Sequence, residues 1–490
     1  MIVEILGAQM LAPYFGTSHF VWTAQIGVTL LALAAGYYAG GWLADRSPRL
    51  GYLYGAILLA AIYLCLTVLM VRKAANLCLE FNLATGSLLA SAFLFFIPLS
   101  LLAMVGPFFV RFVTESVAGV GGSVGRLTAI STLGSVAGTV LISYVLIPFL
   151  PKSVTMYLTA GVLMLVAAGY FVVQERRAMP LVLAGCAIGL GLGYGGMTAR
   201  QPMANSTEIE QHNSNFGTLQ VVYSKDGLTR FLLNDFLIQN AYDPIEKKSR
   251  LIFSYMLHGL ANGYATEIKN VLCIGMGVGI VPMEFVRDGA KVDVVEINPS
   301  VVPLARRHFD FEPERVRIVI DDGRHFINVS TNRYDAVILD AFLGDSSPWH
   351  LMTQEAFSEI RERLRPGGVL AINTFGDFAQ GNDFSLRSIE RTLRAVFRSV
   401  KVHNNYLEVG VHNVFFAASD QAELGPVRKP DLDRVHAVWK KDVQITFGGV
   451  VQGSPTEGRV LTDDFNPVPF YDAHNREQFR RKLVEWAATL

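Results

Sequence analysis

Long apolar runs fill the first 196 residues of this 490-residue chain, and they constrain its fold more than any other feature. Most of these runs reach the roughly 20 residues that a helix needs to cross a bilayer. A shorter apolar stretch, residues 1–16, lacks the basic start of a signal peptide and carries Glu4. The sequence therefore predicts about seven membrane-spanning helices. The long runs are 20–44, 51–71, 83–110, 127–150, 154–173 and 180–196.

Composition supports a membrane protein and gives no sign of a nucleic-acid partner. Hydrophobic residues make up 51% of the chain and charged residues 17%, which is unlike an average soluble protein. The 42 basic residues balance the 42 acidic ones, so there is no basic surplus for nucleic acid. The four cysteines are scattered and the histidines show no ligand-like spacing. We therefore expect neither a disulfide framework nor a metal site.

Residues 197–490 have the pattern of an α/β protein. We expect a connector and a small β-meander over 197–248, because short alternating runs at 218–223, 230–233 and 237–239 are separated by turn signals. From 249 to 490, strands and helices alternate in the cadence of a parallel sheet with right-handed crossovers. The predicted fold is thus an α-helical transmembrane bundle over 1–196, fused to a Rossmann-like α/β domain with an N-terminal β-meander.

A glycine-rich loop follows the first strand of the α/β domain. The stretch CIGMGVGIV (Cys273–Val281) places Gly275, Gly277 and Gly279 between an apolar strand and a helix. Glycines there let the backbone approach a nucleotide-like ligand closely. The third glycine comes one residue earlier than in the dinucleotide-binding pattern G-x-G-x-x-G. This spacing favours a nucleoside sulfonium over a dinucleotide.

Acidic residues close successive predicted strands. Glu296 ends VDVVE, Asp321 and Asp322 follow VRIVI, and Asp340 ends YDAVILD. Glu296 lies 19 positions after Gly277, the spacing at which an acid meets ribose hydroxyls. One such acid could simply cap a helix, as Asp322 could before 324–329. Several acids converging on the carboxyl ends of parallel strands indicate a ligand site.

These motifs resemble the spermidine synthase, or polyamine aminopropyltransferase, family. The resemblance is carried by FLLNDFLIQNA, VLCIGMGVGI, VDVVEINPSVV, VIDDGRHF, YDAVILDAF with GDSSPWHLMTQEAF, and LTDDFNPVPF. The apolar half, with IGVTLLALAAGYYAGGWLADR and STLGSVAGTVLISYVLIPFL, is similar to the membrane-embedded members, the fused transporter-like and spermidine synthase proteins.

The resemblance implies a donor, S-adenosylmethionine or its decarboxylated form, as co-substrate and no metal. The glycine loop would hold this donor together with Gln239 and Gly323, the residue after the paired aspartates. Glu296 would bind the ribose hydroxyls and Asp322 the adenine amine. Asp340 would receive and deprotonate the attacking amine, and Asp345 would supply the second acid of the catalytic loop. An amine in line behind the electrophilic carbon of the sulfonium must be uncharged, which explains the need for a carboxylate.

Two departures from the family leave the substrates open. Val278 stands where the aminopropyl-transferring members carry an acid in G-G-G-D-G-G, and Phe253-Ser254 replaces their Tyr-His. Three functions therefore remain. The first is aminopropyl transfer to a polyamine or another amine. The second is methyl or aminocarboxypropyl transfer from intact S-adenosylmethionine to a lipid or membrane-borne acceptor. The third is a non-catalytic transporter or sensor that binds an adenosyl ligand.

The positions of the arginines and the cytosolic origin of the donor predict opposite orientations of the chain in the membrane. The positive-inside rule would place the loops with Arg46, Arg111 and Arg176 in the cytoplasm and the α/β domain outside. A donor made in the cytosol requires the opposite, and we give that argument more weight. We expect a multi-pass inner- or plasma-membrane protein with a cytoplasmic catalytic domain; a homodimer is a further expectation from the family.

Overall fold

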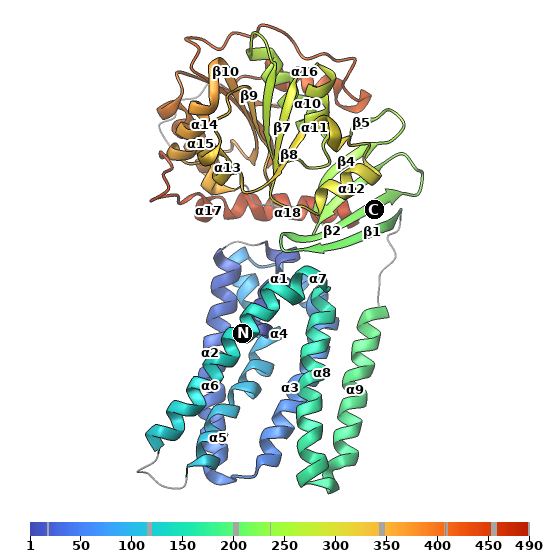
Figure 1. Ribbon diagram of the computed structural model, residues 1–490, viewed down its shortest axis with the longest axis vertical. Helices are drawn as coiled ribbons and strands as arrows, with labels where there is room; N and C mark the ends of the chain where they lie inside the picture. Colours follow the sequence, from blue (N-terminus) through green and yellow to red (C-terminus); the bar gives the residue numbers. More distant parts are fainter. Residues whose placement is uncertain are drawn as a thin grey trace. The chain divides into compact units, whose positions relative to one another are not determined.

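The computed structural model divides the chain into two compact units, Met1–Pro202 and Met203–Leu490 (Figure 1). The residues it describes are 1–16, 19–114, 120–198, 205–235, 237–342, 348–405, 407, 410–451 and 458–488. We describe each unit separately.

The first unit is helical. Six of its described helical segments are long and apolar enough to cross a membrane: Phe20–Arg46, Leu50–Cys78, Leu83–Val113, Val120–Phe149, Lys152–Gln174 and Arg176–Gly196. A shorter apolar helix, Ile2–Phe15, corresponds to the predicted first span. A π-helical turn, Ile142–Leu146, joins α6 to α7. The helices are α1 (Ile2–Phe15), α2 (His19–Arg46), α3 (Leu50–Cys78), α4 (Leu83–Ala103), α5 (Val105–Val113), α6 (Val120–Leu141), α7 (Ile147–Phe149), α8 (Lys152–Gln174) and α9 (Met179–Thr198).

Glycines on α2 allow α2 and α4 to pack at close range. A Cβ atom on Gly36 would overlap the backbone carbonyl of Ser100, and one on Gly40 would lie 2.8 Å from Cα of Met104. Small residues at this spacing let helix backbones approach each other in a bilayer, where association depends on van der Waals contact. Another run of mostly small residues, at 134–138, lies on α6, of which no described residue is buried.

The second unit begins with a five-stranded antiparallel sheet, in the order β1-β2-β3-β4-β5. Its side chains alternate between two faces. Leu219, Val221 and Leu232 join the core of the larger sheet, whereas Phe231 and Leu233 belong to a separate small cluster. The predicted meander is thus present, and it also contains β1 and β5, which the sequence analysis did not identify. The strands are β1 (Ser206–Ser214), β2 (Gly217–Ser224), β3 (Arg230–Asn234), β4 (Leu237–Asp243) and β5 (Lys248–Ser249).

A seven-stranded sheet forms the centre of the second unit, in the order β11-β12-β10-β9-β6-β7-β8. From β8 to β10 all neighbouring strands pair in parallel. β12 is antiparallel to both of its neighbours, β10 and β11. The strands are β6 (Asn270–Ile274), β7 (Lys291–Glu296), β8 (Arg317–Ile320), β9 (Tyr334–Leu339), β10 (Leu364–Gly376), β11 (Ser399–Asn404) and β12 (His412–Ser419).

Helices cover both faces of this sheet (Figure 1). One core cluster lies beneath α10, α11, α12 and α16, and a second lies beneath α13, α14, α15 and α17. This arrangement is a Rossmann-like, methyltransferase-type fold, so the predicted fold class is confirmed. The helices are α10 (Ile252–Tyr264), α11 (Ile280–Arg287), α12 (Val301–His308), α13 (Gly323–Val329), α14 (Gln354–Arg363), α15 (Phe384–Val396), α16 (Lys440–Gly448), α17 (Val468–Tyr471) and α18 (Ala473–Ala488).

The last helix, α18, contacts both sheets of this unit. Its Trp486 ring lies 6.1 Å from the ring of Phe231 on β3, and its Phe479 ring lies 3.8 Å from the ring of Phe375 at the end of β10. The C-terminal helix therefore reaches the carboxyl ends of the parallel strands, where Rossmann-like sheets bind ligands.

Candidate active site

The glycine loop turns tightly between β6 and α11. Gly275, Gly277 and Gly279 have φ values of 89°, 52° and 84°, in the left-handed region that favours glycine. A Cβ atom on Gly275 would overlap the backbone carbonyl of Asp340, so only a hydrogen atom fits between the ends of β6 and β9. The loop is therefore shaped by its contact with the strand end that carries Asp340.

A pocket opens at the carboxyl ends of β6 to β10. It brings together eight of the residues that the sequence indicated: Gln239, Gly275, Gly277, Glu296, Asp321, Asp322, Gly323 and Asp340. Gly279 is outside the lining, where it begins α11 and faces the ring of Phe311. Asp345 lies outside the described residues.

Glu296 is a buried acid held by the backbone. Its two carboxylate oxygens accept hydrogen bonds from the N–H groups of Met276, at 3.0 Å, and Asn298, at 2.8 Å. Burial raises the pKa of Glu296, and these N–H groups counteract the rise. The carboxylate is thus fixed in orientation beside the glycine loop.

Asp322 caps a helix as well as lining the pocket. Its Oδ1 accepts hydrogen bonds from the backbone N–H groups of Arg324 and His325, the N-cap geometry of α13. Its Oδ2 lies 3.2 Å from Nε2 of His350, which also lines the pocket. The predicted capping role is therefore present, and it leaves one carboxylate oxygen for other partners.

Asp340 directly follows β9, and Asn373, which is itself held by Asn413, donates a hydrogen bond to its carboxylate. Nδ2 of Asn373 on β10 donates to Oδ1 of Asp340 at 2.9 Å, and Nδ2 of Asn413 on β12 donates to Oδ1 of Asn373 at 2.9 Å. Protein surrounds the Asp340 carboxyl apart from its pocket-facing surface. Burial raises its pKa from 3.8 to about 6, although the Asn373 hydrogen bond opposes the rise. A carboxyl that titrates near neutral pH is suited to accept a proton.

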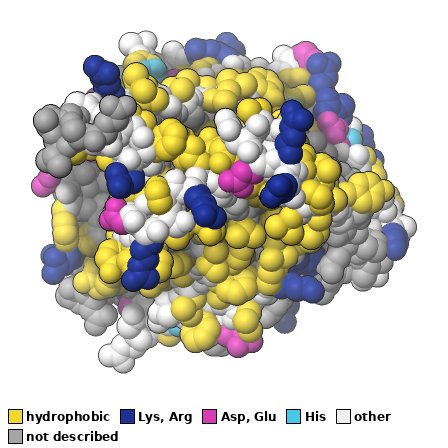
Figure 2. Space-filling model, turned by 90° about the horizontal axis from the view of Figure 1, so that it is seen from below, with side chains coloured by type: hydrophobic (Ala, Val, Ile, Leu, Met, Phe, Trp, Pro, Cys, Tyr) yellow, Lys and Arg dark blue, Asp and Glu magenta, His cyan; other side chains and the backbone are white. Residues whose placement is uncertain are grey.

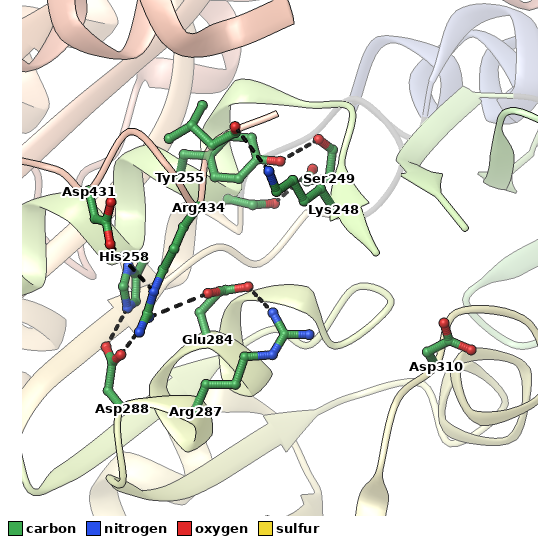
Figure 3. A network of polar contacts seen from close by, with 12 residues as sticks. Lys248, Ser249, Tyr255, His258, Glu284, Arg287, Asp288, Asp310, Asp431 and Arg434 are labelled. Carbon is green, nitrogen blue, oxygen red and sulfur yellow. Dashed lines mark hydrogen bonds and ion pairs between the residues drawn. The ribbon is translucent and has the colours of Figure 1, made fainter. Parts of the chain in front are cut away.

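A polar network holds α11 behind the glycine loop (Figure 3). Asp288, just after α11, accepts from Nε2 of His258 on α10 at 2.7 Å and from Nη1 of Arg434 at 2.5 Å. Arg434 also lies 3.8 Å from the carboxylate of Glu284, which pairs with Arg287. Burial alone would raise the pKa of Asp288, but the bonds from His258 and Arg434 lower it to about 2. The network ties α10 and α11 to the segment that contains Arg434.

The residues at the two departures from the family, Val278 and Phe253-Ser254, lie differently relative to the pocket. Val278 is 1% exposed, belongs to the hydrophobic core and is not among the residues that line the pocket. Phe253 lines the pocket, whereas Ser254 is buried and lies 3.2 Å from the hydroxyl of Ser249. The side chain at position 278 therefore offers no polar atom to a ligand.

Several pocket residues were not indicated by the sequence analysis. Asn373 closes the strand VLAIN in the same way that Asp340 closes the previous strand, so strand-end position could have identified it. Phe342 and Phe375 follow two residues after Asp340 and Asn373. Phe479 comes from α18 and had no such signal, because nothing in its local sequence places this helix beside β10.

One cluster in the described residues has metal-ligating atoms within reach of one another. Ligand atoms of Asp243, Glu246 and His436 lie within 4.8 Å, away from the pocket. Cations already neutralise both acids, since Arg250 donates to Asp243 at 2.9 Å and Nζ of Lys248 lies 3.4 Å from Glu246. The cluster is explained as an ion-pair network, and the expectation that no metal takes part stays a prediction.

The strand order and this pocket define a Rossmann-like domain of the kind that binds nucleosides at its strand ends. Residues 250–417 match the spermine/spermidine synthase domain, and this part of the chain is therefore a domain of that type.

Similar proteins include transferases of two kinds. The chain is 36% identical to a polyamine aminopropyltransferase from Vibrio vulnificus over 140 residues, 27% of this chain and 46% of the relative. It is 32% identical to an N-terminal histidine N-methyltransferase from Emericella nidulans over 167 residues, 33% of this chain and 29% of the relative. The chain thus spans less than half the length of either. The solved spermidine synthase from Thermotoga maritima aligns with a TM-score of 0.40 and 21% identity, over 50% of this chain and 84% of that one.

The raised pKa of Asp340 predicts that Asp340→Asn stabilises the protein at high pH. A carboxyl whose pKa is higher in the folded state contributes stability below its ordinary pKa of 3.8, and that stability is lost as pH rises through about 6. The shift corresponds to at most about 3 kcal/mol. Thermal unfolding in detergent should therefore show a higher Tm for Asp340→Asn near pH 8 and little difference near pH 4. A Tm of Asp340→Asn below that of the unchanged protein at both pH values would contradict the raised pKa of Asp340.

Proposed function

We propose that the second unit transfers an aminopropyl group from decarboxylated S-adenosylmethionine to an amine acceptor. The observation that carries this proposal is the charge of the pocket. Its described lining contains four acidic side chains, Glu296, Asp321, Asp322 and Asp340, and neither lysine nor arginine. A sulfonium that also carries an ammonium fits such a lining, as does a cationic amine.

The order of the strands supports one orientation of the donor. Asp321 and Asp322 follow β8, Glu296 ends β7, the glycine loop follows β6, and Asp340 follows β9. We place the adenine beside Asp322 and Gly323, and the ribose hydroxyls on Glu296. Gln239 and the loop glycines Gly275 and Gly277 then flank the sulfonium, and Gly279 supports the turn from behind. The carbon to be transferred comes to lie beside Asp340.

The proposed reaction is a single in-line displacement. The lone pair of the acceptor nitrogen forms a bond to the aminopropyl carbon next to sulfur. The carbon–sulfur bond breaks, and its electron pair goes to sulfur, which leaves methylthioadenosine as a neutral thioether. The proton released from the nitrogen passes to the Asp340 carboxylate. Asn373 keeps this carboxylate oriented, and Asp345 retains its predicted role as a second acid of the same loop.

Pocket charge also bears on which form of the donor binds. Intact S-adenosylmethionine carries a carboxylate, which would face four acidic side chains and neither lysine nor arginine in the described lining, where His350 already lies 3.2 Å from Asp322. Decarboxylation removes this repulsion. Since Val278 is buried in the core, we infer that the pocket acids together attract the donor ammonium that the family's loop acid would hold.

Methyl or aminocarboxypropyl transfer from intact S-adenosylmethionine to a lipid or membrane-borne acceptor is a second candidate. It is favoured by the similarity to the N-methyltransferase and by the apolar residue at position 278. A third candidate, a non-catalytic transporter or sensor, predicts no donor turnover. The retention of both Asp340 and Glu296 in the pocket counts against it.

By-product analysis distinguishes the three candidates. We expect purified protein, incubated with decarboxylated donor and amines, to release methylthioadenosine, and Asp340→Asn to lower the rate at least about 100-fold, in the range typical of general-base loss. Mass spectrometry identifies the nucleoside. S-adenosylhomocysteine from the intact donor would instead establish methyl transfer. Donor binding without any product would indicate the third candidate.

Glu296→Gln should weaken methylthioadenosine binding about tenfold or more, the loss expected for hydrogen bonds to a charged group. The Glu296 carboxylate now accepts hydrogen bonds from two backbone N–H groups. In the glutamine variant, the NH₂ group would face one of these N–H donors and that hydrogen bond would be lost. Isothermal titration calorimetry measures the change. Glu314→Gln is the matched control, because Glu314 is 61% exposed and outside the pocket. Equal affinities of the two variants would contradict the ribose role of Glu296.

We further propose that the helical unit anchors the enzyme in a membrane. The six long apolar segments alternate in direction, and this brings Arg46, Arg49, Arg111, Arg126, Arg176 and Arg177 to one end of the unit. Figure 2 shows Lys and Arg side chains spread among hydrophobic ones on the face seen from below. The chain leaves α9 at the opposite end. The positive-inside rule would therefore place the catalytic unit outside the cytoplasm.

A donor made in the cytosol requires the catalytic unit to be cytoplasmic, and we propose that side because turnover depends on the donor. Green fluorescent protein fused after Leu490 should then fluoresce, and alkaline phosphatase fused there should be inactive. An active phosphatase fusion would show that the arginine distribution, and not the donor, sets the orientation.

A further inference from the structure

A small recess adjoins the pocket at the glycine loop. Its volume is about 10 Å³, which is room for one water-sized group. Asn240, Asp340 and the loop residues Gly275–Gly277 line both the recess and the pocket. The recess therefore lies directly beside the place proposed for the sulfonium.

Asn240 on β4 brings a buried amide to this recess. The residue is 5% exposed, and no hydrogen bond joins its side-chain amide to another described residue. A Cβ atom on Gly277 would lie 2.8 Å from Oδ1 of Asn240 and 3.2 Å from its Nδ2, so the amide lies against the glycine loop. A buried amide without a partner is costly, because it has lost its hydrogen bonds to water. A ligand group in the recess would supply the missing bond.

Ser254 on α10 offers a hydrogen-bond acceptor to the same space. Its hydroxyl donates to the hydroxyl oxygen of Ser249 at 3.2 Å, and the Ser249 hydroxyl donates in turn to the carbonyl of Leu251 at 3.0 Å. The Ser254 proton is thereby engaged, which leaves its oxygen free to accept. Asn240 adds an amide oxygen and Asp340 a carboxylate. Three acceptors from β4, α10 and the end of β9 thus border one water-sized space.

We infer that this recess holds the ammonium at the end of the donor's aminopropyl chain and that Asn240 selects it, an inference that rests on the proposed transfer reaction. An ammonium has N–H donors and no acceptor, which matches a space bordered by acceptors. Asp340 supplies the negative charge that a buried cation needs. Gly275 and Gly277, which flank the sulfonium in the proposed placement, form one wall of the recess. Asn240 thus takes over from the loop acid that Val278 replaces.

The size of the recess discriminates between the two forms of the donor. In intact S-adenosylmethionine, the carbon that bears the ammonium also bears a carboxylate. A space for one water-sized group cannot take both groups. The carboxylate would also lie near the carboxylate of Asp340, which repels it. The recess therefore favours the decarboxylated donor by its size as well as by its charge.

Three inert thioether analogues of the donor test this inference by isothermal titration calorimetry on the full chain in detergent. The aminopropyl thioether of adenosine carries the ammonium, the butyl thioether has a methyl group in its place, and S-adenosylhomocysteine adds the carboxylate. We expect the aminopropyl thioether to bind about tenfold or more tightly than the butyl thioether, the gain expected for hydrogen bonds to a charged group. It should also bind more tightly than S-adenosylhomocysteine. Equal affinities of the aminopropyl and butyl thioethers would overturn the inference.

Asn240→Leu should remove the preference for the aminopropyl thioether over the butyl thioether. Its affinity for methylthioadenosine, which has no aminopropyl chain, should stay unchanged. Asn332→Leu is the matched control and should keep the preference, because Asn332 is exposed and outside both the pocket and the recess. A preference that survives in Asn240→Leu would contradict the role of Asn240. If Asn240→Leu no longer binds methylthioadenosine, Ser254→Ala takes its place, and an undiminished preference in that variant would overturn the inference.

The failure of this inference and the failure of the proposed function give different results. The thioethers cannot transfer a group, so their affinities do not depend on turnover. Release of methylthioadenosine from the decarboxylated donor, without a preference for the aminopropyl thioether, would refute the ammonium site and leave the proposed function intact. The preference without any release would support the ammonium site and refute the proposed transfer.

Discussion

The contact between the ends of β6 and β9 is the constraint on which the rest of the site depends. The N–H of Asp340 donates to the carbonyl of Ile274 at 3.0 Å, and the N–H of Gly275 donates to the carbonyl of Val295 at 2.9 Å. These bonds bring the ends of β9, β6 and β7 into register. A side chain at Gly275 would force Asp340 away, so the glycine loop and the proposed base can exist together only with glycine there.

This register also creates an electrostatic cost that a cationic ligand would relieve. Burial raises the pKa of both Glu296 and Asp340, which means that the pocket disfavours the charged form of these two carboxyls. Hydroxyl donors on Glu296 and a cation beside Asp340 would supply the stabilisation that water no longer gives. Carboxyls whose pKa is raised by burial are common at binding and catalytic sites.

Much of this arrangement was predictable from sequence because parallel strands carry residues to one edge in chain order. Glu296, Asp322 and Asp340 were identified by their positions at strand ends, and the apolar runs marked the six long helices. The antiparallel strand β12 and the C-terminal helix α18 were not predicted. Their partners are distant in sequence, so no local pattern places Asn413 behind Asn373 or Phe479 beside Phe375.

The central claim is that an adenosyl thioether lies across this sheet edge with its sulfur toward Asp340. The most direct test is an experimental structure of the full chain bound to methylthioadenosine. The account predicts ribose hydroxyls within about 2.6–3.2 Å of the Glu296 carboxylate, with the sulfur on the Asp340 side of the glycine loop. A nucleoside bound elsewhere, or one whose ribose leaves Glu296 bonded only to the backbone, would contradict it.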